Sequence, residues 1–207
     1  MKNKIKQRYI PSIPMFVTIY LCVIGICIVV DQLTKFFIYD ELLREVGQVN
    51  VLGEFLIFTP VLNEGAAWGM AKGDWANILF FVITVVGTPL FAGLLWRARK
   101  RSVTGQVGFA FIIGGTIGNA IDRACYQATE QFYSGKVRDF IHFSFFDPVF
   151  NVADSFLTIG VVLAIVAILF LDQDSVLAMF KKQRKDKLEA QNDTPAAEGA
   201  ENTDENH

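Results

Sequence analysis

Two aspartates in the second half of the sequence, Asp139 and Asp154, have the spacing that paired-carboxyl chemistry needs. The connection between them includes HFSFFDPVFN, whose Pro148 can fold the chain back and bring the two carboxyl groups together. Two carboxyl groups about 3 Å apart cannot both ionise, so they share one proton and titrate as a pair. One can then accept a proton from water while the other protonates a carbonyl or a leaving amine. The pair could hydrolyse an amide bond, although Asp139 could also be an ordinary loop acid.

Two further pairs of polar residues have the i, i+4 spacing of one helix face. Asp31 and Lys35 stand in the acid-first order that favours a simple intrahelical ion pair. Asn119 and Arg123 have the same spacing, and Arg123 could extend its guanidinium to lipid headgroups. Both pairs therefore have a structural interpretation beside a functional one.

Asn151 and Asp154 match an N-cap residue followed by an acid at the third helical position, near the positive end of the helix dipole. Pure capping is therefore an alternative to catalysis for Asp154. His142 belongs to no cluster of Cys, His and carboxylate residues with metal-ligand spacing, so we expect neither a metal nor another cofactor. No Ser stands with a His and an acid in a way that suggests a hydrolytic triad.

Four uncharged segments must position these groups. Residues 9–30, 76–96, 102–121 and 155–171 contain no Asp, Glu, Lys or Arg, and the last three run for 21, 20 and 17 residues. A helix of about 20 apolar residues spans the hydrocarbon core of a bilayer. The sequence therefore predicts a membrane α-helical protein with four transmembrane helices.

The positively charged residues indicate the orientation, because short cytoplasmic segments are rich in Lys and Arg. Four precede the first span, four lie between the second and third spans, and five follow the fourth, whereas 39–75 holds two and 122–148 holds three. We expect both termini in the cytoplasm and the two long connections outside. The polar residues, scattered over 124 positions, then gather at the outer interface: Asp31, Lys35, Asn63, Asn119, Asp122, Arg123, Asp139, Asn151 and Asp154.

The net charge of −2 comes from the C-terminal end. Residues 188–207 hold six acids and no Lys or Arg, and the chain without them has a net charge of +4. A basic balance beside membrane spans indicates membrane lipid as a partner and not nucleic acid. We expect a cytoplasmic N-terminal segment 1–14, a membrane domain 15–171 and a cytoplasmic tail 172–207 that is disordered after residue 187.

The first outer connection has a strand-like composition. Residues 46–62 are rich in Val, Ile and Phe and are punctuated by Gly47, Gly53 and Pro60. We expect two or three short strands that form a small extracytoplasmic β-sheet. Its polar edge cannot enter hydrocarbon, so the sheet should lie on the outer membrane surface.

Five short blocks give the chain a family resemblance. They are DQLTK at 31–35, NEGAAWG at 63–69, GNAIDR at 118–123, VRDFI at 137–141 and FNVADS at 150–155. With these blocks in this order, the chain resembles the lipoprotein signal peptidases, also called signal peptidase II, a family of bacterial membrane aspartyl peptidases.

The resemblance implies an activity and a site. Asp139 and Asp154 would be the catalytic dyad, and the supporting or substrate-binding residues would be Asp31, Lys35, Asn63, Asn119, Arg123, Asn151 and Ala153. The substrate would be a prolipoprotein whose cysteine bears diacylglycerol, cut just before that cysteine. The protein would be a monomer in the bacterial cytoplasmic (inner) membrane. Two departures stand out: Trp68 replaces an expected Phe, and Arg138 puts a cation beside Asp139 that could depress its pKa.

Two other classes of function compete with this interpretation. A small proton-coupled transporter or channel could use Asp31, Asp139 and Asp154 as relay groups, but no carboxylate lies at the middle of a span to carry a proton across. A non-catalytic membrane adaptor could hold partners through the outer sheet, but it would leave the paired aspartates unexplained.

Overall fold

The computed structural model describes residues 11–63, 74–125, 135–172 and 175–192. Its first element is a long helical stretch in three parts: α1 (Ile13–Thr34), the π-helix η1 (Lys35–Leu42) and α2 (Leu43–Val46). Helical structure thus extends past residue 39, where the sequence suggested the start of an outer connection. The stretch ends at Gly47, whose φ of 76° lies in the region that favours glycine.

Three more apolar helices correspond to the other expected spans. They are α3 (Asp74–Arg97), α4 (Val103–Cys125) and α5 (Val152–Val166), and the short helix η3 (Ala98–Lys100) precedes α4 while η4 (Ala167–Leu171) follows α5. Among the described residues, two helical stretches are long and apolar enough to cross a membrane, Ile13–Val46 and Val152–Asp186. Many of their apolar side chains face outward, such as Leu21 and Ile26, which are 63% and 61% exposed. Outward-facing apolar side chains on such helices suit a lipid environment.

The four strands form one antiparallel sheet in the order β1–β2–β3–β4. They are β1 (Val49–Leu52), β2 (Leu56–Asn63), β3 (Val137–Phe143) and β4 (Phe146–Phe150). The first two lie in the segment where strands were expected. The second pair corrects the sequence interpretation, because Pro148 does not make the turn. It lies inside the edge strand β4, where a residue without an N–H is tolerated.

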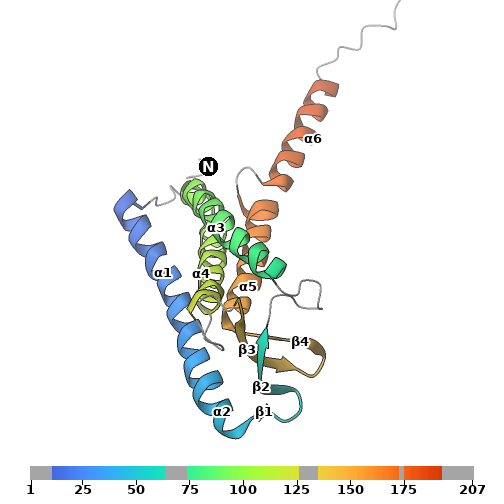
Figure 1. Ribbon diagram of the computed structural model, residues 1–207. Coiled ribbons are helices and arrows are strands. Elements are labelled where there is room, and N and C mark those ends of the chain that lie inside the picture. Colours follow the sequence, from blue (N-terminus) through green and yellow to red (C-terminus); the bar gives the residue numbers. More distant parts are fainter. Residues whose placement is uncertain (1–10, 64–73, 126–134, 173–174, 193–207) are drawn as a thin grey trace, which may run out of the picture.

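Helix α4 is the centre of the bundle and packs against α1, α3 and α5 (Figure 1). Its glycines allow close approach on two sides. A Cβ at Gly115 would lie 2.5 Å from the Ala153 carbonyl oxygen of α5, and one at Gly118 would lie 2.7 Å from Asp31 Oδ2 of α1. These glycines therefore bring the start of α5 and the outer part of α1 up to the same end of α4.

The sheet and the last helix lie at opposite ends of the bundle (Figure 1). The sheet packs beside α2 and the start of α5, whereas α6 (Val176–Asn192) projects from the end where α1 begins. Helix α6 continues past residue 187, so the expectation of disorder from that point is wrong for residues 188–192. Residues 193–207 lie outside the described residues.

Candidate active site

Asp139 lies in the middle of the sheet on β3, opposite Val61 of β2. Its side chain is buried, 1% exposed, and accepts two hydrogen bonds. Asn63 Nδ2, at the end of β2, donates to Asp139 Oδ2 at 2.8 Å, and Asn151 Nδ2 donates to Oδ1 at 2.6 Å. Asp139 is therefore fixed from two sides and is not an ordinary loop acid.

Asp154 occupies the first turn of α5 and completes a capping box with Asn151. The Asn151 side chain accepts from the Asp154 N–H at 3.0 Å, and the Asn151 N–H donates to Asp154 Oδ2 at 3.2 Å. The capping interpretation is thus confirmed, but it accounts for one oxygen only. Asp154 Oδ1 accepts from Asn119 Nδ2 of α4 at 2.8 Å. The same carboxylate can therefore cap the helix and belong to a polar site.

Asn151 and Asn119 link the two aspartates. Asn151 Nδ2, which binds Asp139, also donates to Asn119 Oδ1 at 3.0 Å, and Asn119 in turn binds Asp154. The two carboxyl groups are thus linked through shared amides, and the charge of Asp154 acts on Asp139. A proton shared directly between them stays a prediction from the sequence.

The environment raises the pKa of Asp139 to about 7. Burial is the largest cause, and the negative charge of Asp154 is the second. Hydrogen bonds from Asn63 and Asn151 and the charge of Lys35 oppose the shift without cancelling it. Asp139 can therefore hold a proton near neutral pH, which an exposed aspartate cannot do.

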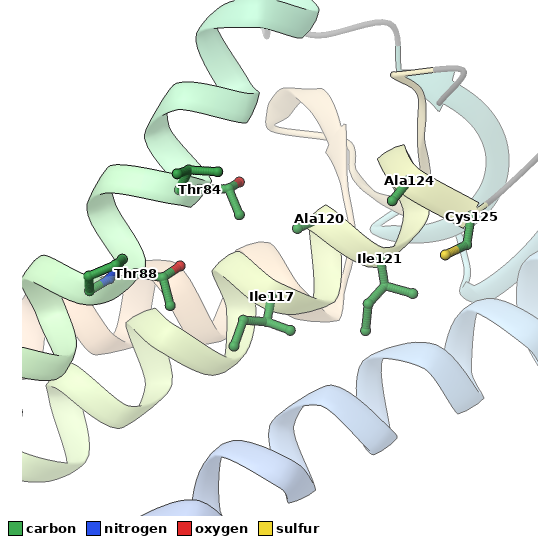
Figure 2. A pocket seen from close by; sticks show the side chains of 9 residues that line it. Thr84, Thr88, Ile117, Ala120, Ile121, Ala124 and Cys125 are labelled. Carbon is green, nitrogen blue, oxygen red and sulfur yellow. The ribbon is translucent and has the colours of Figure 1, made fainter. Parts of the chain in front are cut away.

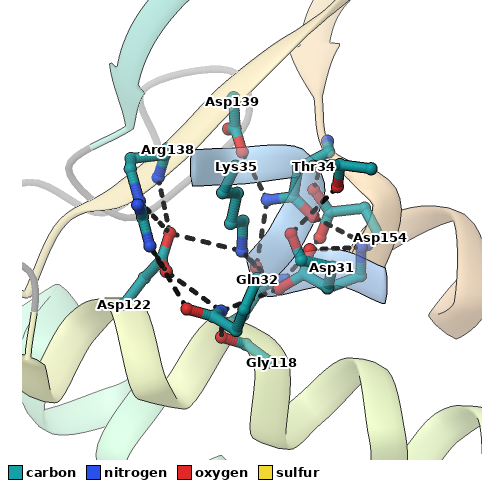
Figure 3. Close-up of polar contacts among 12 residues, drawn as sticks. Asp31, Gln32, Thr34, Lys35, Gly118, Asp122, Arg138, Asp139 and Asp154 are labelled. Carbon is teal, nitrogen blue, oxygen red and sulfur yellow. Dashed lines mark hydrogen bonds and ion pairs between the residues drawn. The ribbon is translucent and has the colours of Figure 1, made fainter. Parts of the chain in front are cut away.

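Lys35 lies between Asp122 and Asp31 within the same polar network (Figure 3). Its ammonium group lies 2.8 Å from Asp31 Oδ2, 3.2 Å from Asp122 Oδ2 and 3.0 Å from Asn119 Oδ1, and these carboxylates and the lysine are 0% exposed. The predicted i, i+4 pair therefore exists but is part of a larger network. Asp31 Oδ1 also accepts from the Ala153 N–H at 2.9 Å, which fixes the start of α5 against α1.

Four residues of this network were not among the predicted site residues: Gln32, Asp40, Asp122 and Arg138. Arg138 donates to Asp122 through its backbone N–H at 2.9 Å and through its guanidinium at 2.7 and 3.3 Å, and it also pairs with Asp40. Gln32 Nε2 donates to Asp122 Oδ1 at 3.2 Å. The sequence placed Asp122 in the outer polar layer, and its position three residues after Asn119 in the GNAIDR block could have assigned it to the site as well.

Arg138 corrects a second expectation. Neighbouring residues of a strand point to opposite faces, so Arg138 faces Asp122 of α4 while Asp139 faces Asn63 and Asn151. The pKa of Asp139 is raised despite the neighbouring cation, because burial and the charge of Asp154 outweigh the contributions that lower it. Burial alone would lower the pKa of Arg138, but its carboxylate partners Asp122 and Asp40 outweigh burial and raise it.

Arg123 is placed on the side of α4 that faces α3. Its Cζ lies 4.0 Å from the centre of the Phe80 ring, so the guanidinium stacks on an aromatic face. The structure thus brings eight of the nine predicted site residues into one hydrogen-bonded network and places Arg123 against α3. Trp68 lies outside the described residues.

A shallow apolar groove runs between α3 and α4 (Figure 2). It has a volume of about 450 Å³ and is lined by Thr84, Val85, Thr88, Pro89, Ile117, Ala120, Ile121, Ala124 and Cys125. Small side chains face it from both helices. Among the described residues there is no group of three or more His, Cys, Asp and Glu side chains that could hold a metal ion.

A bundle of apolar helices that carries two linked aspartates at one end has the features of a membrane-embedded aspartic peptidase. The family model described as "Signal peptidase (SPase) II" matches residues 23–170. The chain belongs to the signal peptidase II family. The resemblance inferred from the five sequence blocks is therefore confirmed.

Curated relatives and solved structures agree with this assignment. The chain is similar to a lipoprotein signal peptidase of Listeria welshimeri, 36% identical over 158 residues, which are 74% of this chain and 93% of the relative. Another of Staphylococcus carnosus is 34% identical over 166 residues, 80% of this chain and 95% of the relative. Two chains titled as structures of a bacterial membrane enzyme are each 31% identical, with TM-scores of 0.58 and 0.60, and cover 74% and 75% of this chain and 89% and 95% of their own.

Proposed function

We propose that this enzyme removes the signal peptide from diacylglyceryl-modified prolipoproteins, cutting before the lipidated cysteine, with Asp139 and Asp154 as its catalytic dyad. The observation that carries the proposal is that these two carboxyl groups share one amide network while the pKa of Asp139 is raised to about 7. Near neutral pH Asp139 can therefore serve as an acid beside a second carboxylate.

The environments of the two carboxyl groups favour different roles. Asp154 Oδ2 accepts a backbone N–H at the positive end of α5, a contact that Asp139 lacks, so we assign Asp154 as the base. Water loses a proton to Asp154 and attacks the scissile carbonyl carbon, while Asp139 protonates the carbonyl oxygen. The resulting gem-diol collapses: a hydroxyl proton returns to Asp139, Asp154 gives its proton to the departing nitrogen, and the C–N bond breaks.

The remaining site residues hold this pair in place. Asn63, Asn119 and Asn151 donate to the carboxylates, and each donor fixes one oxygen. Lys35 holds the Asn119 oxygen, which aims the Asn119 amide nitrogen at Asp154. The apolar groove between α3 and α4 would accept an apolar part of the substrate. The site formed by the described residues needs no residue from a second copy of the chain, and we propose that the enzyme acts as a monomer.

We further propose four membrane spans, with both termini in the cytoplasm of a bacterium and the dyad at the outer face of the inner membrane. The charge distribution supports this orientation, and so does the position of the sheet at the end opposite α6 and the start of α1 (Figure 1). Reporter fusions at Gly73 and Gly135 should read as external, and one after residue 187 should read as cytoplasmic. A cytoplasmic reading at either glycine would contradict the common outer layer.

The direct test of the activity uses the full chain purified in detergent. Incubation with a diacylglyceryl-modified prolipoprotein should give a signal peptide and a mature protein that begins at the lipidated cysteine, as identified by mass spectrometry. The same precursor without lipid should stay intact or be cut far more slowly.

Variants of the dyad distinguish this chemistry from a contaminating protease. Asp139→Asn and Asp154→Asn should abolish cleavage, whereas Asp147→Asn should retain it, because Asp147 is an exposed acid on the neighbouring strand β4. Cleavage that survives both dyad substitutions in folded protein would refute the assignment.

A further inference from the structure

We propose that Arg138 is a positioning residue of the dyad, which fixes β3 against α4 and shares the charge of Asp122 with Lys35, so that Lys35 keeps its contact with Asn119. This inference rests on the proposed function and extends it to residues outside the predicted site. It concerns the five-residue link from Asp40 to Asn119, made up of Asp40, Arg138, Asp122, Lys35 and Asn119.

Arg138 binds Asp122 through both its side chain and its backbone. Its side chain is 9% exposed and donates to both oxygens of Asp122, with Nη2 at 2.7 Å from Oδ1 and Nε at 3.3 Å from Oδ2. The backbone N–H of Arg138 adds a bond of 2.9 Å to the same carboxylate. A planar guanidinium bound at two points fixes orientation as well as distance. The backbone of β3 at Asp139 is therefore tied to helix α4 (Figure 3).

Asp122 stands between two cations. Lys35 contacts its Oδ2 at 3.2 Å, so one carboxylate is shared by the lysine and the arginine. Without Arg138 the full negative charge of Asp122 would act on Lys35 alone. That stronger pull would compete with the 3.0 Å contact from Lys35 to Asn119 Oδ1, and Asn119 is the donor to Asp154. Arg138 thus acts on both aspartates, directly through β3 and indirectly through Lys35.

The π-helix η1 supplies the outer end of the link. In an i, i+5 hydrogen-bond pattern, residues five apart lie near one another along the helix, whereas α-helical spacing would turn them to different sides. Lys35 and Asp40 are five apart in η1, and both reach this network. Asp40 Oδ2 pairs with Arg138, while Asp40 Oδ1 is buried without a hydrogen-bond partner in the described part of the chain. A buried, half-satisfied acid is costly, which argues that it has a role other than stability.

The charged groups that face the link set the sign of its effect. In the described part of the chain they are Asp31, Lys35, Asp40, Asp122, Arg138, Asp139 and Asp154. Removing the cation of Arg138 makes ionisation of the dyad harder, and removing the charge of Asp40 makes it easier. The two changes must therefore shift the pH dependence of the enzyme in opposite directions, which a general loss of stability cannot do.

The experiment compares Arg138→Gln, Asp40→Asn and the double variant with the wild type, using full-length enzyme in detergent and a lipidated prolipoprotein. The alkaline limb of kcat/KM reports the free enzyme. We expect Arg138→Gln to move its midpoint up by roughly half a pH unit or more, Asp40→Asn to move it down, and the double variant to lie between them. At the optimum, Arg138→Gln should lower kcat by about tenfold or more, with KM changed less than about threefold.

The matched control is Arg101→Gln. Arg101 Nη1 also pairs with a buried carboxylate, Asp172 Oδ2 at 3.6 Å, but at the far end of the bundle, so this variant should keep the wild-type midpoint and kcat. Shifts of the same sign in Arg138→Gln and Asp40→Asn, or no shift, would overturn the inference. If Arg138→Gln is not recovered folded, Asp40→Asn decides: a midpoint that does not fall overturns it. A wild-type enzyme that cleaves nothing refutes the proposed function instead.

Discussion

Replacing Asp139 by Asn should abolish cleavage and yet stabilise the protein at alkaline pH. The reason is the pKa of Asp139, which is raised from 3.8 to about 7 in the folded chain. Between these values the folded protein keeps a proton that the unfolded chain releases. Stability therefore falls as pH rises, by up to ~1.4 kcal/mol per pH unit. The whole loss is of the order of 4 kcal/mol and is complete above about pH 7.

The Asp139→Asn variant would carry no such cost but would lose a hydrogen bond. Asn63 and Asn151 both donate to the present carboxylate, at 2.8 and 2.6 Å, and an amide has one oxygen to receive them. One unmade buried hydrogen bond costs about 1–3 kcal/mol. The variant should therefore be more stable than the wild type by about 1–3 kcal/mol at pH 8, and less stable by a similar amount near pH 4.

A thiol-reactive dye can follow this reversal during heating once the exposed Cys22 and Cys125 are replaced by Ser in every protein compared. The remaining Cys27 is buried against α4 at Gly114 and reacts only when the bundle opens. Melting temperatures of wild type and Asp139→Asn should be compared between pH 4 and pH 8, with Asp147→Asn as the exposed-acid control whose difference from wild type stays constant. If Asp139→Asn lowers the melting temperature equally at all pH values, ionisation of Asp139 does not lower the stability of the folded wild type. That result would remove the physical basis for its role as the acid.

Four other substitutions and deletions test separate parts of the structure. Asp154→Asn keeps one oxygen for the helix cap but leaves Asn119 without its acceptor, so it should cost about 1–3 kcal/mol in a denaturation experiment, while cleavage falls by about a thousandfold or more. Lys35→Met leaves two buried carboxylates without their lysine and should cost about 3–5 kcal/mol; a normal melting temperature would contradict the network. Gly115→Ala places a Cβ 2.5 Å from a carbonyl of α5 and should lower stability by about 1–3 kcal/mol, whereas Gly25→Ala, with nothing within 4 Å, should be tolerated in the same melt. Deleting residues 188–207 should change kcat/KM by less than about tenfold, since the α6 end lies opposite the sheet; protein abundance must be measured alongside.

The local parts of the site could be predicted from the sequence. The capping box at Asn151 and Asp154 follows from a three-residue spacing, and the pair Asp31–Lys35 follows from helical periodicity. The uneven distribution of Lys and Arg around the four uncharged segments predicted that the polar residues lie in one layer. These signals are short-range, so they survive without knowledge of the tertiary structure.

The non-local parts were missed for physical reasons. Strand β4 contains Pro148, which looks like a turn residue until its position at a sheet edge is known. Asp40 lies five residues from Lys35, a spacing that α-helical periodicity places on another side of the helix. The pKa of Asp139 depends on burial and on the charge of Asp154, which are set by the tertiary structure. The neighbouring Arg138 in the sequence suggested a lowered pKa, whereas the pKa is raised.

Side chains of β3 point alternately to the two faces of the sheet, so the activity of the enzyme depends on the register of this strand. A slip of one residue turns every side chain of a strand to the opposite face. Here it would exchange Arg138 and Asp139, so that a guanidinium would face Asp154 and a carboxylate would face Asp122. The dyad would become an ion pair, and the buried charge between α1 and α4 would lose its arginine. The pairing of β2 with β3 is irregular between Phe58 and Val61, where Pro60 lies in β2. An irregularity of this kind favours one register, so it disfavours the slipped and inactive arrangement of the same fold.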